Sequence, residues 1–514
     1  MEAYAWDQLI ASAEAVRPGL GDLVGLLTSL VEAGVLLAGD RSGLDGDGVV
    51  VGSFDRVEGL VVSDGRELQR RVLQFVLDAQ ALVEVRREGV VDAAGVARTW
   101  VERGHGRTVT GVLGSVVLTR LAYRGVGVGN LYVRDREWSV PVRRYSYALQ
   151  FKALGYALAG SYRRAGQWVA AETGVVVGTR QLEQVVVEAT RDAEAFYRRE
   201  RACPVVVGAV LVMSVDGKGV PMRPEARRTR AAPTVFDHRP GIGEKRGVKR
   251  MCEVAVVYDA IPPDTVRTPE AIMGSAADSR PAGPVARNRW YRTDITADRA
   301  VTISAAFDQA QARDPAHERD WVVLVDGDLT QIALIEQQAA ERQVTVTILI
   351  DLIHVLEYLW RLAWCFHPPQ DKNAEAWVTA RATEILHGRT DQVITLVEQL
   401  AAAHPPKPGG EHAKNIRKAL TYLTNKQPYL DYPTALTSGW PIATGVIEGA
   451  CRHLVQDRMG ITGARWGLAG AEAVLRLRAL QANGDLDEYW AYHLQQEHHR
   501  NHTSHYATDF TLAA

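Results

Sequence analysis

The sequence is poor in cysteine, has no long apolar run, and is not dominated by either sign of charge. Its four cysteines stand singly among 514 residues, without a C-x-x-C pair, so we expect neither a disulfide framework nor a cysteine-built zinc site. This cysteine usage is typical of a reducing compartment, and we expect the protein to be cytoplasmic. No stretch approaches the roughly 18 apolar residues that span a bilayer. The acidic opening segment also lacks the basic start of a signal peptide.

Positive and negative charges nearly cancel. The chain has 59 Lys and Arg against 61 Asp and Glu, a formal net charge of −2, which argues against a polybasic protein that coats nucleic acid. With 46% hydrophobic and 23% charged residues, its composition is that of a globular protein. At roughly 150 residues per domain, its length predicts about three or four domains.

The amino-terminal part is predicted to be helical and then to form a small sheet. Apolar residues recur at helical spacing from Leu23 to Val35 and again from Leu73 to Leu82, which predicts a helical region over residues 1–100. Short β-branched runs broken by glycine follow, from Arg107 to Val133. They predict a small antiparallel β unit within 101–144.

A helix-turn-helix is the next prediction, within 145–202. One helical pattern ends at Gly174, a short connector follows, and a second helix opens at Thr179, which could cap it. Arg163, Arg164 and Arg180 give the pair positive charge. A plain helical hairpin would produce the same pattern, so the motif alone does not establish DNA binding.

From 203 to 358 the pattern predicts the order β-β-β-α-β-α-β. The first strand runs to Asp216-Gly217 and the fourth to Asp326-Gly327, and each aspartate is expected at a glycine turn. Helical patterns then fill 359–440. A final helix, expected from Ala443 to Met459, falls within 441–485, and 486–514 reads as a polar tail that frays after His498.

The two Asp-Gly pairs are the first candidates for chemistry. If the first and fourth strands are neighbours, Asp216 and Asp326 lie side by side at the strand ends. Carboxylates there suit Mg²⁺, a hard cation that keeps several waters, and paired ions support phosphodiester cleavage and strand transfer. Asp-Gly after a strand is also common turn chemistry.

A third carboxylate is expected from a helix that packs beside the sheet. Glu448 fits, because Thr444 can cap its helix, and Cys451 and Arg452 follow on the same face. An acidic residue in the first turns of a helix is also favoured by the helix dipole alone.

Four motifs together resemble a known family. They are VDGKG around Asp216, LVDGD around Asp326, D-L-I-H from Asp351 to His354, and IEGACRHLVQDRMGITGARW from Ile447 to Trp466. They resemble the bacterial insertion-sequence transposases of the ISKra type, which are Mutator-related DDE enzymes. The similarity runs with gaps from about Arg107 to Leu480, and its most specific part is DRM-x-x-x-G-x-R-W.

The resemblance implies a multidomain α+β protein with a ribonuclease-H-like α/β catalytic core and a helical insertion. It implies that Asp216, Asp326 and Glu448 bind Mg²⁺ or Mn²⁺, with Asp351 and His354 as an accessory pair near the site. An alternative register makes Asp351 the second triad member; Asp326 is preferred because it ends the fourth strand. A capped helix start with a hydrogen-bonded histidine would also explain Asp351 and His354. Relatives often carry a Cys-rich knuckle after the β unit, which this sequence lacks.

Basic residues gather beside the first aspartate. Between Met222 and Arg250, nine Arg and Lys face three acidic residues, a local charge of 9 − 3 = +6. This segment could bind DNA phosphates, or it could be a solvated loop. Trp466 could stack on an unpaired base, or it could lie in the core. The residues predicted to bind DNA here are Lys218, Arg227, Arg228, Arg230, Lys245, Arg246, Lys249, Arg250, Arg452, Arg458, Arg465 and Trp466.

These observations predict a DNA transposase of a bacterial insertion sequence, associated with the nucleoid. Its partners would be double-stranded DNA, as transposon ends and target, and further copies of itself, without a membrane. A catalytically silent DNA-binding descendant and a ribonuclease-H-like nuclease that cuts without joining are the alternatives.

Overall fold

The computed structural model divides the chain into two compact units, which are described separately. Unit 1 comprises Met1–Asp192 with Glu488–Ala514, and unit 2 comprises Ala193–Asp487. The structure describes residues 54–199, 206, 208–227, 248–274, 282–368, 370–461 and 463–507. The predicted helix from Leu23 to Val35 lies outside the described residues.

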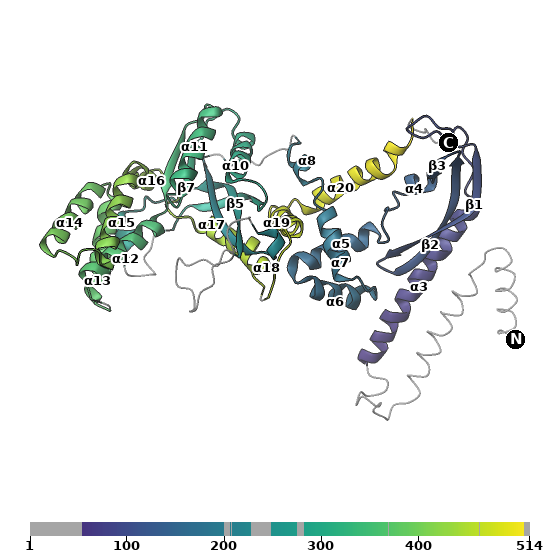
Figure 1. Ribbon diagram of the computed structural model, residues 1–514, viewed down its shortest axis with the longest axis horizontal. Helices are drawn as coiled ribbons and strands as arrows, with labels where there is room; N and C mark the ends of the chain where they lie inside the picture. Colours follow the sequence, from purple (N-terminus) through teal and green to yellow (C-terminus); the bar gives the residue numbers. More distant parts are fainter. Residues whose placement is uncertain are drawn as a thin grey trace, which may run out of the picture. The chain divides into compact units, whose positions relative to one another are not determined.

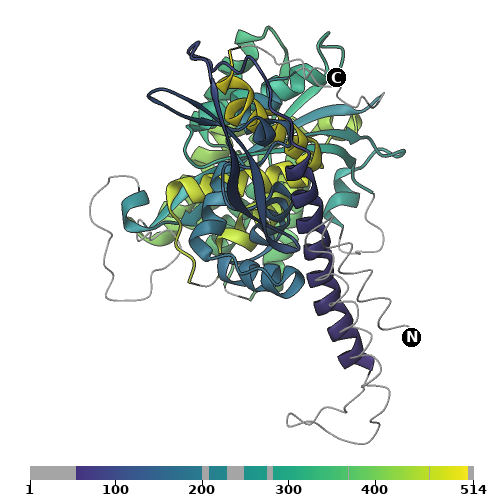
Figure 2. The same cartoon turned by 90° about the vertical axis from the view of Figure 1, so that its right-hand side faces the viewer.

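Unit 1 begins with a long helix beside a three-stranded sheet. Helix α3 (Phe54–Leu82) is followed by the antiparallel strands β1 (Trp100–Gly111), β2 (Gly114–Gly125) and β3 (Val128–Leu131). The C-terminal half of α3 lies along β2 (Figures 1 and 2). There Gln74 exchanges two hydrogen bonds with the backbone of Val117. The predicted β unit is confirmed, but helix does not continue from Leu82 to residue 98.

The predicted pair of helices is also present in unit 1. Helix α6 (Tyr162–Thr173) ends at Gly174, whose φ of 70° is left-handed, and α7 (Thr179–Glu188) follows after a short connector. Ser161 caps α6 by accepting a hydrogen bond from the N–H of Arg164. The Thr179 cap is wrong: the N-cap position is Gly178, whose N–H donates to the side chain of Gln181. Helices α4 (Val133–Glu137) and α5 (Tyr147–Ala159) precede the pair.

The carboxyl-terminal segment is part of unit 1 rather than a frayed polar tail. Helix α20 (Leu486–Asn501) and the short helix η5 (Thr503–His505) lead to Tyr506, which is buried with Val90, Leu121, Tyr123 and Val133. The prediction of fraying after His498 is therefore wrong through residue 507. Apolar and aromatic residues spaced along this polar stretch supply the contacts, including Trp490 against Phe151.

Unit 2 is built around a five-stranded mixed sheet with the spatial order β6-β5-β4-β7-β8. Strand β5 runs antiparallel to β4 and β6, whereas β4, β7 and β8 are parallel. The predicted order β-β-β-α-β-α-β is confirmed, and so is the expectation that the first and fourth strands are neighbours. The elements are β4 (Val210–Pro221), β5 (Lys249–Ile261), β6 (Val285–Asp294), α10 (Arg299–Arg313), β7 (Trp321–Val325), α11 (Leu329–Glu341) and β8 (Val346–Ile350).

Helices cover both faces of this sheet, which explains why its central strands are almost continuously apolar. Every residue of β7 is buried. Helix α10 packs on β4 and β5 from one side. The other face carries α17 (Gly445–Ala450), the π-helical turn η4 (Cys451–Gln456), α18 (Asp457–Met459) and α19 (Leu468–Ala482).

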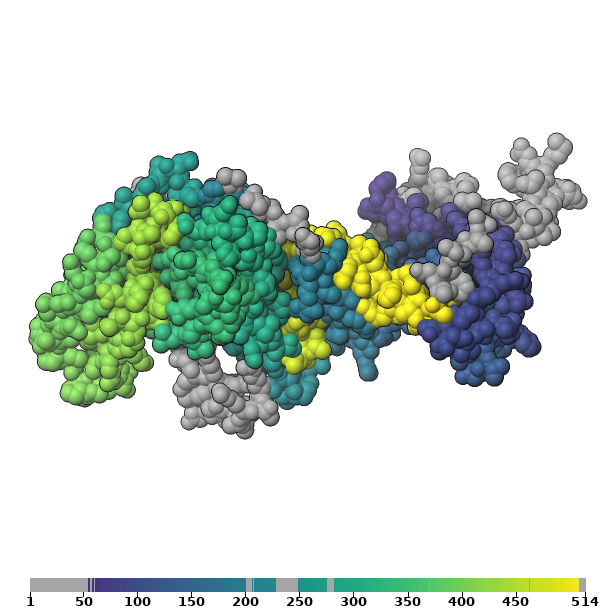
Figure 3. All heavy atoms as spheres, turned by 90° about the horizontal axis from the view of Figure 1, so that it is seen from above, coloured from purple at the N-terminus to yellow at the C-terminus, as the bar shows by residue number. Residues whose placement is uncertain are grey.

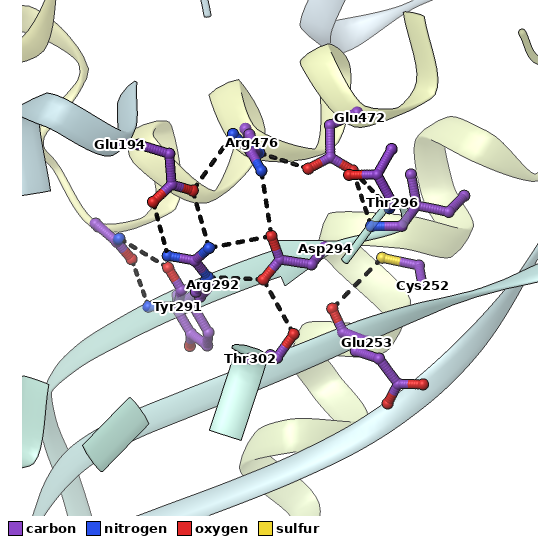
Figure 4. Close-up of polar contacts among 12 residues, drawn as sticks. Glu194, Cys252, Glu253, Tyr291, Arg292, Asp294, Thr296, Thr302, Glu472 and Arg476 are labelled. Atoms are coloured by element: carbon purple, nitrogen blue, oxygen red, sulfur yellow. Dashed lines mark hydrogen bonds and ion pairs between the residues drawn. The ribbon is translucent and has the colours of Figure 1, made fainter. Parts of the chain in front are cut away.

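A partly buried ion network links α19 to the edge strand β6. Arg292 and Asp294 of β6 meet Arg476 of α19 and Glu194 of α8 (Ala193–Tyr197), as Figure 4 shows. Glu472 of α19 also accepts hydrogen bonds from the backbone N–H groups of residues 295 and 296. Each charge in this network has partners of opposite sign, so the network has a structural explanation.

A helical body interrupts unit 2 between β8 and α17, as predicted. Its atoms gather at one end of the unit (Figure 3). It comprises α12 (Leu352–Phe366), α13 (Lys372–Leu386), α14 (Thr390–Ala403), α15 (Glu411–Lys426), η3 (Gln427–Tyr429) and α16 (Tyr432–Thr437). Two short helices, η1 (Pro224–Ala226) and α9 (Pro269–Met273), lie earlier in the unit. Among the described residues, no helix has the length and apolarity to cross a bilayer.

Candidate metal centre

Three aspartates lie at corresponding positions of adjacent parallel strands, Asp216 within β4 and Asp326 and Asp351 directly after β7 and β8. Strand β4 pairs with β7 up to Ser214 and Leu324, and β7 pairs with β8 up to Val325 and Ile350. Continuing both registers by one or two residues places Asp216 beside Asp326 and Asp326 beside Asp351. Parallel neighbours at one register point to the same face of a sheet. The three aspartates therefore lie at one edge of the sheet, where the parallel strands end, and we call this edge the acidic strand edge.

Asp216 does not end its strand, so the predicted glycine turn is wrong. Strand β4 continues to Pro221, paired with β5 throughout. The glycines serve close cross-strand packing instead: a Cβ at Gly217 would lie 2.9 Å from Cε of Met251. Asp216 Oδ2 accepts a 3.4 Å hydrogen bond from Sγ of Cys451. Burial and the nearby Asp216 charge raise the pKa of the Cys451 thiol, so this thiol is a donor.

Asp326 follows the last residue of β7, as predicted, and its side chain is exposed. Its Oδ1 accepts a 2.9 Å hydrogen bond from the N–H of Asp328, and Asp328 in turn caps α11. Gly327 has a φ of 99°, which turns the chain sharply between the two aspartates. One oxygen of Asp326 thus remains without a protein donor in the described structure.

Asp351 is fully buried and serves as the N-cap of α12. Its Oδ1 accepts from the N–H of Ile353 at 3.0 Å, and its Oδ2 accepts from Oγ1 of Thr444 at 2.6 Å. Nδ1 of His354 lies 3.8 Å from Oδ2, which is an ion-pair distance rather than a hydrogen bond. The capped helix start is therefore present, whereas Nδ1 of His354 makes no hydrogen bond to any residue that the structure describes.

Glu448 reaches the same edge from α17. Oγ1 of Thr444 lies 3.4 Å from Oε1 of Glu448 while it donates to Asp351. Thr444 occupies the N-cap position but makes no capping bond to the backbone, so its predicted role as a cap is wrong. The helix begins beside Asp351 at Thr444 and passes Asp216 about two turns later through Cys451. The expected single helix to Met459 contains the π-helical turn η4 from Cys451, a feature often found at functional sites.

Among the residues that the structure describes, no Arg or Lys pairs with these carboxylates. Within the described part of the chain, the one basic nitrogen within 4.0 Å of Asp216, Asp326, Asp351 or Glu448 is Nδ1 of His354. Unpaired carboxylates gathered at one edge are hard oxygen donors of the kind that Mg²⁺ and Mn²⁺ accept. Asp216, Asp326 and Glu448 do not offer three oxygens that all lie within 4.8 Å of one another, so the triad remains a prediction.

A second acidic group lies in unit 1, and sequence reasoning missed it. Asp192, His493 and Glu497 are the described residues whose three ligand atoms lie within 4.8 Å of one another. Asp192 accepts from Nδ1 of His493 at 2.7 Å and from Arg500 at 2.5 Å. Arg500 and Asn501 also donate to Glu497. These partners already satisfy the group, and the sequence signal was only His493 and Glu497 one helical turn apart.

Two of the predicted DNA contacts are wrong because both side chains are buried. Arg458 is 2% exposed, and its guanidinium lies over the ring of Trp466 at 4.7 Å. Trp466 is 6% exposed and donates from Nε1 to the carbonyl of Met459. Trp466 therefore belongs to the core, the alternative that the sequence allowed.

The other predicted DNA contacts fall into three groups. Arg250 is partly buried and donates to the carbonyl of Ile295. Arg228, Arg230, Lys245 and Arg246 lie outside the described residues. The remainder are exposed or half-buried and stay predictions: Lys218, Arg227, Lys249, Arg452, Arg465, Arg163, Arg164 and Arg180.

Comparison with known proteins adds no assignment, because no protein-family model matches the chain and no curated protein matches it either.

Proposed function

We propose that the protein is a DNA transposase of a bacterial insertion sequence, with a ribonuclease-H-like catalytic core in unit 2. One observation carries the proposal: Asp216 of β4 and the aspartates directly after β7 and β8 lie at corresponding positions of neighbouring strands, and a helix brings Glu448 to the same edge. The sheet order supports it, because the first strand lies between the antiparallel second strand and the parallel fourth strand. The sequence resemblance supplies the reaction class.

The carboxylates have distinct tasks in this proposal. Asp216, Asp326 and Glu448 would hold Mg²⁺ or Mn²⁺. When bound, such ions lower the pKa of an attacking water or 3′-hydroxyl and stabilise the leaving oxygen. Asp351 caps α12 and, through the hydroxyl of Thr444, helps to orient the helix that carries Glu448. This arrangement would bind a phosphodiester at the strand edge, cleave it, and join the new 3′ end to a second phosphodiester.

Basic residues of each unit would bind the DNA backbone. Lys218 lies two residues after Asp216 on β4, so it belongs to the same face of the sheet. In unit 1 the exposed Arg163, Arg164 and Arg180 lie on the two helices of the predicted helix-turn-helix. They would contribute to binding of the terminal repeats.

The test uses DNA that flanks the gene on both sides, with and without Mg²⁺. The wild-type protein should cut it in a metal-dependent reaction and join the new 3′ end to a second duplex. Asp216→Asn should reduce both steps by about 10³-fold or more, since several kcal/mol of transition-state stabilisation are lost. Asp320→Asn is the matched control, because Asp320 is exposed and directly precedes β7, at the end of that strand opposite to Asp326.

Each of the other outcomes would favour a different function or contradict the proposed site. Binding of the flanking DNA without any metal-dependent cleavage would favour a catalytically silent descendant. Cleavage without a joined product would favour a nuclease. An Asp216→Asn protein that cuts and joins as well as the wild type would contradict the proposed site.

A further inference from the structure

A buried lysine of the helical insertion lies against the acidic strand edge and has no partner among the described residues. Lys426, the last residue of α15, is 5% exposed. Among the described residues its Nζ has neither a hydrogen-bond acceptor nor a carboxylate within 4.0 Å. An ammonium can donate three hydrogen bonds, and burying it unpaired is costly. A lysine retained for stability alone would be paired or exposed.

The position of this lysine is fixed by the turn that follows Asp326. A Cβ at Gly327 would lie 3.3 Å from Cε of Lys426 and 3.4 Å from Cε2 of Tyr422. Tyr422, one helical turn before Lys426, stacks on Tyr358 of α12 with ring centroids 3.8 Å apart. Its hydroxyl donates to the carbonyl of Asp326. The lysine stem is thus held between the turn and the insertion helices.

The charge of Lys426 acts on the same turn. Burial lowers the pKa of Lys426, and the nearby carboxylates of Asp326 and Asp328 oppose that effect. Asp328 is already paired with Arg299 at 2.5 Å, so Asp326 is the neighbouring carboxylate that lacks a cation. A buried charge is screened less by water than an exposed one, so the ammonium opposes any further cation at Asp326.

We propose that Lys426 is a positioning residue that makes divalent-cation binding at the acidic strand edge dependent on DNA. In the free protein its fixed positive charge weakens cation binding at Asp326. When a DNA phosphate lies at the edge, its negative charge offsets that of the ammonium, and the cations bind more tightly. By linkage, cations then strengthen DNA binding by the same factor. This inference rests on the proposed function, because it presumes that the edge binds cations and DNA phosphate.

The device would have a clear use in a DNA-cutting enzyme. Cations would bind strongly only when the substrate is in place, so the cleavage centre would assemble on DNA. The insertion would contribute to the active site through this single charge and through the Tyr422 contact. The charge acts through space, so the covered Nζ needs no direct contact with DNA.

The experiment measures Mn²⁺ affinity of the full-length protein by electron paramagnetic resonance, with and without a short DNA duplex of arbitrary sequence. Lys426→Met keeps the length of the side chain and removes the charge. It should bind Mn²⁺ about tenfold more tightly than the wild type both with and without DNA, so at low Mn²⁺ the variant should hold the ion before DNA is added whereas the wild type should hold it only with DNA. Lys418→Met is the matched control, because it removes an exposed lysine of the same helix; it should leave both affinities unchanged.

A second readout is the melting temperature. Because Lys426→Met removes an unpaired buried charge, it should melt at the same temperature as the wild type or higher. A lower melting temperature with unchanged or weaker Mn²⁺ binding would show a structural lysine and overturn the inference. Equal affinities in Lys426→Met and Lys418→Met would overturn it too. If Asp216→Asn binds Mn²⁺ as the wild type does, the metal site itself is wrong and both proposals fail.

Discussion

The two acidic clusters of the molecule differ in how their charges are balanced. In unit 1, Asp192 and Glu497 are held by His493, Arg500 and Asn501. At the acidic strand edge of unit 2, Asp216, Asp326 and Glu448 have no cation within 4.0 Å among the described residues. The closely spaced cluster of unit 1 thus has its carboxylates paired with cations and hydrogen-bond donors. The more widely spaced cluster of unit 2 keeps carboxylate oxygens without such partners among the described residues.

The difference teaches that close spacing is a poor guide to metal binding. A carboxylate already bound by a guanidinium has lost the lone pairs and the charge that a cation would use. Such a group stabilises the fold, and any added cation must compete with Arg500. Carboxylates that the fold leaves unpaired repel one another, which destabilises the folded protein. The same unpaired charges prepare the edge to bind cations.

The largest expected effect separates Asp326 from Asp351 within the strand edge. Asp326→Asn should reduce metal-dependent DNA cleavage by about 10³-fold, or about 4 kcal/mol of activation free energy. Asp351→Asn should reduce it less and lower the melting temperature, since Asp351 is buried and caps α12. The measurement is cleavage rate beside thermal unfolding for both variants. Full activity in Asp326→Asn, with none in Asp351→Asn, would show that Asp351 rather than Asp326 is the second carboxylate of the triad.

A smaller effect is expected for the satisfied cluster. Asp192→Asn leaves Arg500 and His493 without their shared partner and should destabilise unit 1 by about 3 kcal/mol, with no change in Mn²⁺ affinity. Burial tends to raise the pKa of Asp192, but His493 and Arg500 lower it below the ordinary value. Its stabilising contribution is therefore present above the unfolded pKa of about 3.9 and lost as pH falls through the folded pKa. Denaturant unfolding at neutral and acidic pH checks both statements, and an unchanged stability would contradict them.

The elements of unit 2 could be predicted from the sequence because their patterns are local. Apolar runs such as that of β7, bounded by polar residues, indicate buried strands, and the alternation with helices gives their order. The glycine turn at Asp216 was wrong because glycine reports a local backbone preference, whereas β4 is extended by its pairing with β5 over twelve residues. Tertiary pairing overrode the local signal.

The candidate site could be predicted only in part. Asp216, Asp326 and Glu448 follow from motifs, but the shared register with Asp351 depends on strand pairing that no local pattern gives. Three further residues become informative only through partners more than 90 residues away in the sequence. Thr444 contacts Asp351, Cys451 contacts Asp216, and Lys426 lies at the Gly327 turn. For the same reason the burial of Arg458 could not be recognised, whereas a core position for Trp466 was among the sequence predictions.

The most direct test of the central claim is a crystal grown with Mn²⁺ and examined by anomalous diffraction. The anomalous signal of Mn²⁺ gives the position of the ion directly, so one measurement shows which of the two acidic clusters binds it. We predict an anomalous peak bounded by the carboxylates of Asp216, Asp326 and Glu448, and none beside Asp192. A peak at Asp192, His493 and Glu497, with an empty strand edge, would contradict the account.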